Sequence, residues 1–117
     1  MPFTHLDSVE PEEIIAGFHG KLIHTDNLTI SFWQIEAGAT LPGHNHQHEQ
    51  VTAVLEGRLQ FVLDGEERVL EPGAVAVIPG GVFHSAQALT DCRVVDVFQP
   101  ARSDYPGQFH RTEAAAD

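Results

Sequence analysis

The feature of this sequence that most limits its fold is a series of short runs rich in Val, Ile, Leu, Phe and Thr. From Lys21 onward these runs are about five to nine residues long, and turn-forming residues separate them. Such spacing is typical of antiparallel sandwiches and barrels, so the sequence predicts an all-β fold of about eight strands. Helical periodicity is confined to one short turn, expected at 12–16 after Pro11 and before Gly17.

The expected strands alternate with recognisable turns. They are 28–35, 51–55, 59–63, 68–70, 74–78, 82–88 and 93–98. Asp64-Gly65 lies between two of them and supplies the positive φ angles that a tight hairpin requires. Glu71-Pro72-Gly73 forms a further turn, in which Pro fixes φ.

The length of 117 residues suits one domain. We expect its core at about 21–105, an N-terminal strap at 1–20 and a C-terminal tail at 106–117, of which 111–117 is expected to fray. A chain of this size buries a smaller fraction of its surface than a large protein. It therefore gains stability from association or from a bound metal.

The charge of the chain restricts its partners. Its 17 acidic and 6 basic residues give a net charge of -11, which repels a phosphate backbone and argues against nucleic acid. An acidic substrate would need a local cation.

Residues 1–11 lack the features of a signal peptide and no run is long enough to span a membrane, so we expect a cytoplasmic protein. The single cysteine, Cys92, cannot form an internal disulfide, which fits a reducing compartment. We expect it to be a small buried apolar residue.

The densest chemical signal is the histidine-rich segment 38–50. In an extended strand side chains alternate between faces, so His44 and His46 project to the same side, about 7 Å apart along the backbone. That separation allows both imidazoles to chelate one ion, and Gln50 shares their parity. The alternative to a built metal site is a solvated, histidine-rich loop that binds metal only adventitiously.

Two neighbours leave the ligand set open at this point. His48 has the same parity as His46, and we expect a bend near Gln47 to deflect one of the inward groups. Glu49 offers a carboxylate, which ordinarily binds a divalent ion better than the amide of Gln50.

A second segment, Gly73-x5-Pro79-x-Gly81-x2-His84, ends in an imidazole at the start of a strand. With Gly38-x5-His44-x-His46-x3-Gln50-x6-Gly57, about 15 residues earlier, it resembles the two signature motifs of the cupin superfamily. The resemblance implies a double-stranded β-helix, or jelly-roll barrel. It also implies one divalent metal on four ligands, which are His44, His46, Gln50 and His84.

The chain departs from the family pattern at two positions. Gln50 stands where the family usually has Glu, and Ala88 where it usually has Asn. A neutral ligand leaves the metal a stronger Lewis acid and a poorer stabiliser of oxidised iron, which favours non-redox chemistry. Three imidazoles and one amide oxygen suit Ni, Zn, Mn, Fe or Co. The histidines outside the motifs are expected to be surface or hydrogen-bonded residues: His5, His19, His24 and His110.

A narrower resemblance covers 95–105 together with the histidine segment. These residues are similar to those of the small KdgF-type cupins of pectin and alginate degradation. Such cupins act on the 4,5-unsaturated uronates that polysaccharide lyases release and promote their conversion to the linear keto form. The resemblance implies a metal-dependent, isomerase-like enzyme with a sugar-acid substrate, and it implies that Asp96, Phe98 and Arg102 face that substrate.

The implied roles are chemically coherent. Asp96 and Phe98 are two residues apart and share a face, where the carboxylate could move a proton during tautomerisation. Arg102 could pair bidentately with the uronate carboxylate. The alternatives are a turn cap at Asp96, core packing at Phe98 and a surface ion pair at Arg102. Trp33 is expected to pack in the core.

Other functions remain open on the sequence. They are an Fe(II) dioxygenase with the same ligands, a polyketide cyclase and a non-catalytic module that binds metal or a sugar acid. Cupins commonly form dimers by pairing sheet edges or packing sheets, and we expect a homodimer here.

Overall fold

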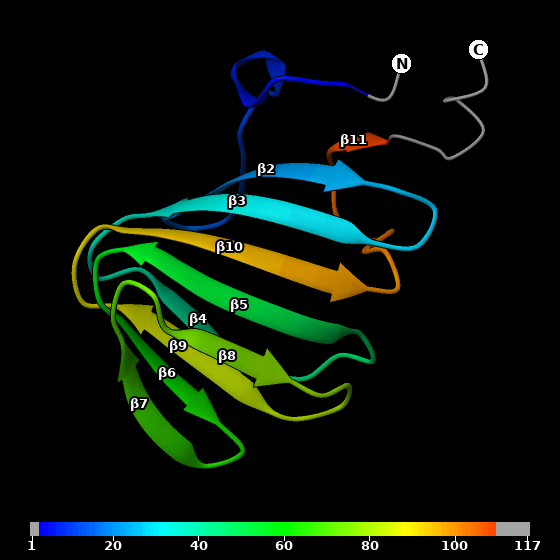
Figure 1. The fold of residues 1–117 in the computed structure, drawn as a ribbon. Coiled ribbons are helices and arrows are strands. Elements are labelled where there is room, and N and C mark those ends of the chain that lie inside the picture. The colour runs from blue at the N-terminus through cyan, green and yellow to red at the C-terminus, as the bar shows by residue number, and fades with distance from the viewer. Residues whose placement is uncertain (1–2, 110–117) are drawn as a thin grey trace.

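Two sheets face each other in the computed structural model, which describes residues 3–109 (Figure 1). The large sheet has the spatial order β1 (Glu12–Ile15), β2 (Phe18–His24), β3 (Thr29–Ile35), β10 (Cys92–Gln99), β5 (Glu49–Glu56) and β8 (Val75–Ile78), with β11 (Gln108–Phe109) also paired to β2. The small sheet has the order β4 (Thr40–His44), β9 (His84–Ala88), β6 (Leu59–Leu63) and β7 (Glu66–Leu70). A short 3-10 turn, η1 (Leu6–Ser8), precedes β1.

The connectivity is that of a jelly roll. Strand β10 comes late in the chain but lies between β3 and β5, which follow each other in chain order among the strands of the large sheet (Figure 1). Likewise β9 separates β4 from β6 in the small sheet. These insertions interleave the two halves of the chain, and the expected all-β, double-stranded β-helix is confirmed.

The core forms where the inward faces of the two sheets meet. Strands β2, β3 and β10 alternate between buried and more exposed residues along their lengths, as strands with one covered face do. The buried cluster includes Phe18, Trp33, Ile35, Val54, Leu59, Phe61, Ile78 and Val94. Cys92 is also buried there, as expected for a small apolar residue.

The turn between β6 and β7 follows the sequence prediction. Asp64 and Gly65 adopt φ angles of 49° and 82°, the left-handed region that a two-residue hairpin requires. The hairpin pairs Leu63 with Glu66 at its closed end.

The helical turn expected at 12–16 is wrong, because these residues form β1 and the turn into β2. Strand β1 pairs antiparallel with β2, from Glu12 opposite Gly20 to Ile15 opposite Phe18. Ile14 and Ile15 are partly buried against the core, so pairing with a neighbouring strand outweighs the weak helical signal of an isolated segment. The expected strap and tail thus both add strands to the large sheet, while 110–117 lie outside the described residues.

In the described part of the chain, no helix is long and apolar enough to cross a membrane.

Candidate metal centre

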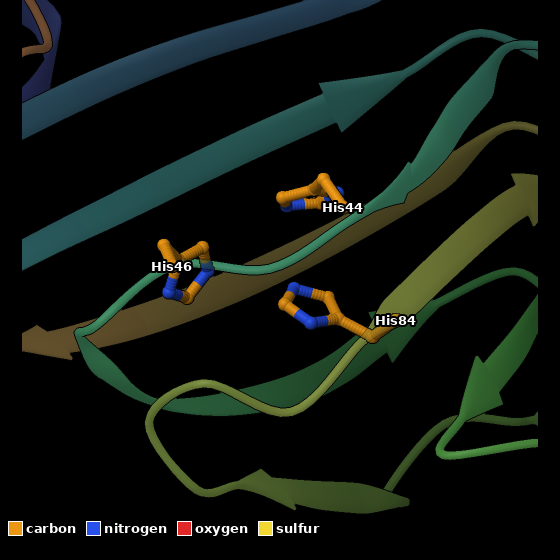
Figure 2. Close-up of side chains that lie close together, drawn as sticks. All are labelled: His44, His46 and His84. Atoms are coloured by element: carbon orange, nitrogen blue, oxygen red, sulfur yellow. The ribbon is translucent and has the colours of Figure 1, made fainter.

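Three imidazoles meet at one end of the space between the sheets. His44 ends β4, His46 lies in the connection to β5, and His84 begins β9. Strand pairing places His44 directly opposite His84. The ring centroids are 4.3 Å apart for His44 and His84, 5.0 Å for His46 and His84, and 5.5 Å for His44 and His46. Figure 2 shows the three rings around a common space. One nitrogen of each ring lies within 4.8 Å of those of the other two.

The hydrogen bonds of these rings leave the same nitrogen available on each. In His44, His46 and His84 the Nδ1 atom faces a backbone carbonyl, which can only accept a hydrogen bond. The three carbonyls are those of Pro42, His48 and Val82, at 2.9, 3.0 and 2.9 Å. Nδ1 therefore carries the proton and Nε2 keeps its lone pair, as in metal-binding histidines.

Burial keeps two of the imidazoles neutral. Desolvation is the largest cause of a lowered pKa at His46 and at His84, since a charged ring is less stable away from water. The Nε2 atom of His84 is buried and has no hydrogen-bond partner among residues 3–109. A buried lone pair without a donor is costly unless a cation satisfies it.

Gln50 turns its oxygen toward the histidines. Its Nε2 donates to Thr52 Oγ1 at 2.9 Å, and the Thr52 hydroxyl donates to Asp96 Oδ1 at 2.6 Å. These bonds orient the amide, so Gln50 Oε1 lies 3.0 Å from His46 Nε2. Two acceptors that face each other at this distance favour a shared cation. The donor set of three imidazoles and one amide oxygen fits a divalent transition metal.

The segment between His46 and Gln50 is not a continuous extended strand. Strand β4 ends at His44, and the chain bends at Gln47 and His48 before β5 begins at Glu49. The expected bend is therefore present, and His48 lies beside the rings of His46 and Phe98, outside the group of three histidines. Glu49 is exposed because it alternates with the buried Gln50 along β5.

Asp96 lies on the inward face of β10, among buried groups. Its Oδ2 accepts a hydrogen bond from Trp33 Nε1 at 3.0 Å, and its Oδ1 accepts the bond from Thr52. Desolvation raises the pKa of Asp96 to about 6, against the opposing effect of these hydrogen bonds. Trp33 packs in the core as expected, but its indole N–H also holds Asp96, which the sequence did not indicate.

The predicted substrate-facing residues share one cavity with the histidines. Asp96, Phe98 and Arg102 line it together with His44 and His46. Its apolar part includes Phe18, Trp33, Ile35, Leu59, Phe61, Ala86 and Val94. The polar groups therefore gather beside the histidines, while the rest of the wall is apolar, as in most small-molecule sites.

Arg102 is buried, with 6% of its surface exposed, and both an ion pair and aromatic rings hold it. Its Nη2 lies 2.8 Å from Asp104 Oδ2, so the ion pair considered as the alternative is present. Its guanidinium carbon lies 3.9 Å from the centroid of the Tyr105 ring and 4.9 Å from that of Phe98. Sequence reasoning missed Asp104 and Tyr105, although both follow Arg102 closely in the chain.

Three histidines outside the motifs make the hydrogen bonds expected of them. His5 accepts from the Asp7 amide at 3.1 Å, and His24 bonds Thr29 at 2.7 Å. His19 bonds Glu36 at 2.7 Å in an exposed group that also includes Glu13. His110 lies outside the described residues.

The fold is a small jelly roll, and two of its sequence motifs bring three imidazoles together between the sheets. These two features place the protein in the class of β-barrel proteins with a histidine cluster. The chain belongs to the cupin family, since residues 31–98 match the family Cupin_2, which is described as "Cupin domain". Members of this family typically bind a metal.

Two KdgF proteins are among the relatives. The chain is 29% identical to the pectin degradation protein KdgF of Dickeya dadantii over 102 residues, which cover 85% of this chain and 93% of that protein. The structure of KdgF from Halomonas sp. superposes with a TM-score of 0.82 at 32% identity, covering 87% of this chain and 96% of that one. A salicylate 1,2-dioxygenase of Pseudoaminobacter salicylatoxidans has a TM-score of 0.69 at 25% identity, over 73% of this chain and 27% of its own.

Proposed function

We propose that the protein is a metal-dependent cupin that promotes the opening and tautomerisation of 4,5-unsaturated uronates to their linear keto form. The observation that carries the proposal is the shared cavity, where a buried acid, Asp96, and a buried cation, Arg102, lie with His44 and His46 of the three-histidine group. The similarity to two KdgF proteins, one of them named for pectin degradation, supports the same reaction.

Four side chains would hold the metal: His44, His46, Gln50 and His84. When bound, the ion supplies Lewis acidity at a substrate oxygen. Thr52 keeps the Gln50 amide oriented through its hydrogen bonds. Because Gln50 is neutral, the site is better suited to polarising a bond than to stabilising a higher oxidation state.

Asp96 would move the protons of the reaction. Opening the hemiacetal ring breaks the bond between C1 and the ring oxygen, turns the C1 hydroxyl into an aldehyde and leaves an enol at C5. Tautomerisation then removes the proton of the enol hydroxyl and adds a proton at C4. With a pKa of about 6, the Asp96 carboxylate can accept one proton and return it near neutral pH. No atoms are gained or lost overall.

Arg102 would bind the carboxylate of the uronate. The acidic chain needs a local cation for an anionic substrate, and Arg102 provides one inside the cavity. Phe98, which lies between Arg102 and His46, offers an apolar surface for the sugar carbons.

The test is to incubate metal-loaded protein with lyase-generated unsaturated uronate and follow the absorbance of the C=C bond. We expect this absorbance to fall faster than it does spontaneously. Asp96→Asn and His84→Ala should abolish the acceleration, whereas Glu71→Gln, an exposed turn variant, should retain it. A rate equal to the spontaneous rate for the metal-loaded wild type rejects the proposal.

A second candidate is an iron-dependent dioxygenase, favoured by the three-histidine group and by the structural similarity to the salicylate 1,2-dioxygenase. It requires oxygen consumption by the iron-loaded protein with an aromatic hydroxy acid. The uronate reaction consumes no oxygen, so an oxygen electrode separates the two candidates.

A further inference from the structure

Two fully buried polar residues, His24 and Thr29, lie on the inward face of the large sheet but do not line the cavity. His24 ends β2, Thr29 begins β3, and the strand register pairs the two residues. The register continues from Thr29 to Phe98 and from Phe98 to Gln50. The pair therefore belongs to the same row of inward side chains as the candidate metal ligand Gln50.

Hydrogen bonds connect this pair to the chain that follows β10. The backbone N–H of Arg102 donates to Thr29 Oγ1 at 2.8 Å, and Thr29 Oγ1 lies 2.7 Å from His24 Nδ1. The second ring nitrogen, Nε2, lies 3.0 Å from the carbonyl oxygen of Pro106, which can only accept a hydrogen bond. Nε2 therefore carries a proton, and the Thr29 hydroxyl donates to Nδ1. The bonds thus run in one direction, from the Arg102 N–H to the Pro106 carbonyl.

Residues 102–106, which we call the arginine loop, are tied at both ends to one imidazole. The first residue of the loop is bonded through Thr29, and the last residue, Pro106, is bonded directly. Within the loop the Tyr105 N–H donates to the Arg102 carbonyl at 3.1 Å. Anchors at both ends of so short a loop restrict the backbone conformations of the residues between them.

The chain leaves the arginine loop through Gly107, which lies against the same histidine. Gly107 has a φ angle of 138°, and a Cβ atom there would lie 2.9 Å from His24 Nε2 and 2.7 Å from the carbonyl oxygen of Leu22. Only glycine allows the backbone to pass β2 this closely. Strand β11 then pairs with β2 (Figure 1).

The contacts that hold the guanidinium group of Arg102 do not fix the loop to the barrel. Asp104 and Tyr105 pair with and stack on this group, but both belong to the arginine loop and move with it. Placement of the loop relative to the cavity therefore depends on contacts with other strands. His24 on β2 and Thr29 on β3 provide such contacts at both ends of the loop.

We propose that His24 is a positioning residue for substrate binding, which acts through Thr29 and Pro106 to hold Arg102 in the cavity. The inference rests on the proposed function, in which Arg102 binds the carboxylate of the uronate. Since His24 does not line the cavity, its loss should displace Arg102 and leave the proton transfer by Asp96 unchanged.

The test uses two substitutions at one buried position. Thr29→Val keeps the shape of the side chain and removes the hydroxyl, whereas Thr29→Ser keeps the hydroxyl. We expect KM for the unsaturated uronate to rise about ten-fold in Thr29→Val, with kcat within about two-fold of the wild type, because a displaced guanidinium binds the carboxylate less tightly. Thr29→Ser should have the KM of the wild type. His24→Phe removes both anchors and should raise KM at least as much as Thr29→Val.

Thr25→Val is the matched control, because it weakens the same hairpin without touching the arginine loop. Thr25 lies in the turn between β2 and β3, where its Oγ1 accepts from the Leu28 amide at 2.9 Å. We expect its KM to equal that of the wild type. Circular dichroism checks that each variant is folded.

Hydrogen exchange of the Arg102 amide tests the link without any substrate. In the wild type this amide donates to Thr29 Oγ1. Its exchange, followed by NMR, should be at least about ten-fold faster in Thr29→Val than in the wild type and Thr29→Ser.

Three results overturn the proposal. An active wild type with an equal KM in Thr29→Val shows that Arg102 binds substrate without this anchor. An equal rise of KM in Thr25→Val assigns the effect to the stability of the hairpin. Unchanged exchange of the Arg102 amide in Thr29→Val shows that the hydroxyl does not hold the loop. A wild type that only matches the spontaneous rate rejects the proposed function instead, and the exchange experiment still decides whether Thr29 holds the loop.

Discussion

Asp104 holds Arg102 by two hydrogen bonds, accepting from Nε at 3.0 Å and from Nη2 at 2.8 Å. Asp104 is exposed, whereas Arg102 is buried and lines the cavity. The bidentate contact with Asp104 uses the edge of the guanidinium group formed by Nε and Nη2. A second pair of parallel N–H groups lies on the edge formed by Nη1 and Nη2, and a carboxylate can bind there. Asp104 thereby fixes the direction in which Arg102 can bind a carboxylate.

Replacing Asp104 with Asn should weaken substrate binding more than it slows the chemical step. The amide loses the negative charge and one acceptor, so Arg102 is held less firmly, while Asp96 is untouched. We expect KM for the unsaturated uronate to rise about ten-fold, equivalent to about 1.4 kcal/mol, with kcat within about two-fold of the wild type. Steady-state kinetics with Glu71→Gln as control measures this split, and a loss confined to kcat contradicts it.

The same ion pair predicts how stability depends on pH. The Arg102 guanidinium lowers the pKa of Asp104 to about 2, below the value of about 3.9 for an unfolded chain. The pair therefore stabilises the fold fully above pH 4, and this contribution is lost as the pH falls toward 2. The free energy of unfolding of the wild type should exceed that of Asp104→Asn at pH 5, and the difference should shrink by pH 2. Urea unfolding at several pH values measures it; a constant difference disproves the assignment.

Thr52 links the amide of Gln50 to the carboxylate of Asp96, and Thr52→Val removes this link without a change of shape. The amide of Gln50 is then free to rotate, so affinity for Zn²⁺ or Ni²⁺ should fall by about ten-fold or more. Isothermal titration calorimetry measures the affinity without any substrate. The exposed Thr40 on β4 provides the matched control, since Thr40→Val should bind the metal like the wild type. Equal affinities for both variants would show that Thr52 does not position the ligand.

Metal binding should stabilise the fold through His84. A ligand at about 100 times its Kd adds about 2.7 kcal/mol to the free energy of unfolding, which raises Tm by several degrees. His84→Ala should abolish this gain in Tm on addition of Zn²⁺. His19→Ala, which removes the histidine of the exposed group with Glu13 and Glu36, should keep it. The opposite pattern would place the metal in the exposed group.

Part of the site followed from local spacing and part did not. The separation of His44 and His46 and the position of His84 at the start of a strand pointed to one cluster, and the structure brings these rings together. The bond between Trp33 and Asp96 joins residues 63 positions apart on neighbouring strands. Side-chain alternation places both on an inward face, but it does not say that β3 and β10 are neighbours.

The amino-acid sequence by itself determined the all-β class, the tight turn at Asp64-Gly65 and the residues that face inward, because these depend on local backbone preferences and on a two-residue period. Only the tertiary structure decided that 12–15 form a strand, that His46 lies beyond the end of β4, and that Asp104 and Tyr105 hold Arg102. Each of these depends on hydrogen bonds or packing that become available only after the chain has folded. Segments distant in sequence supply those partners, and no local pattern records which segment will be adjacent.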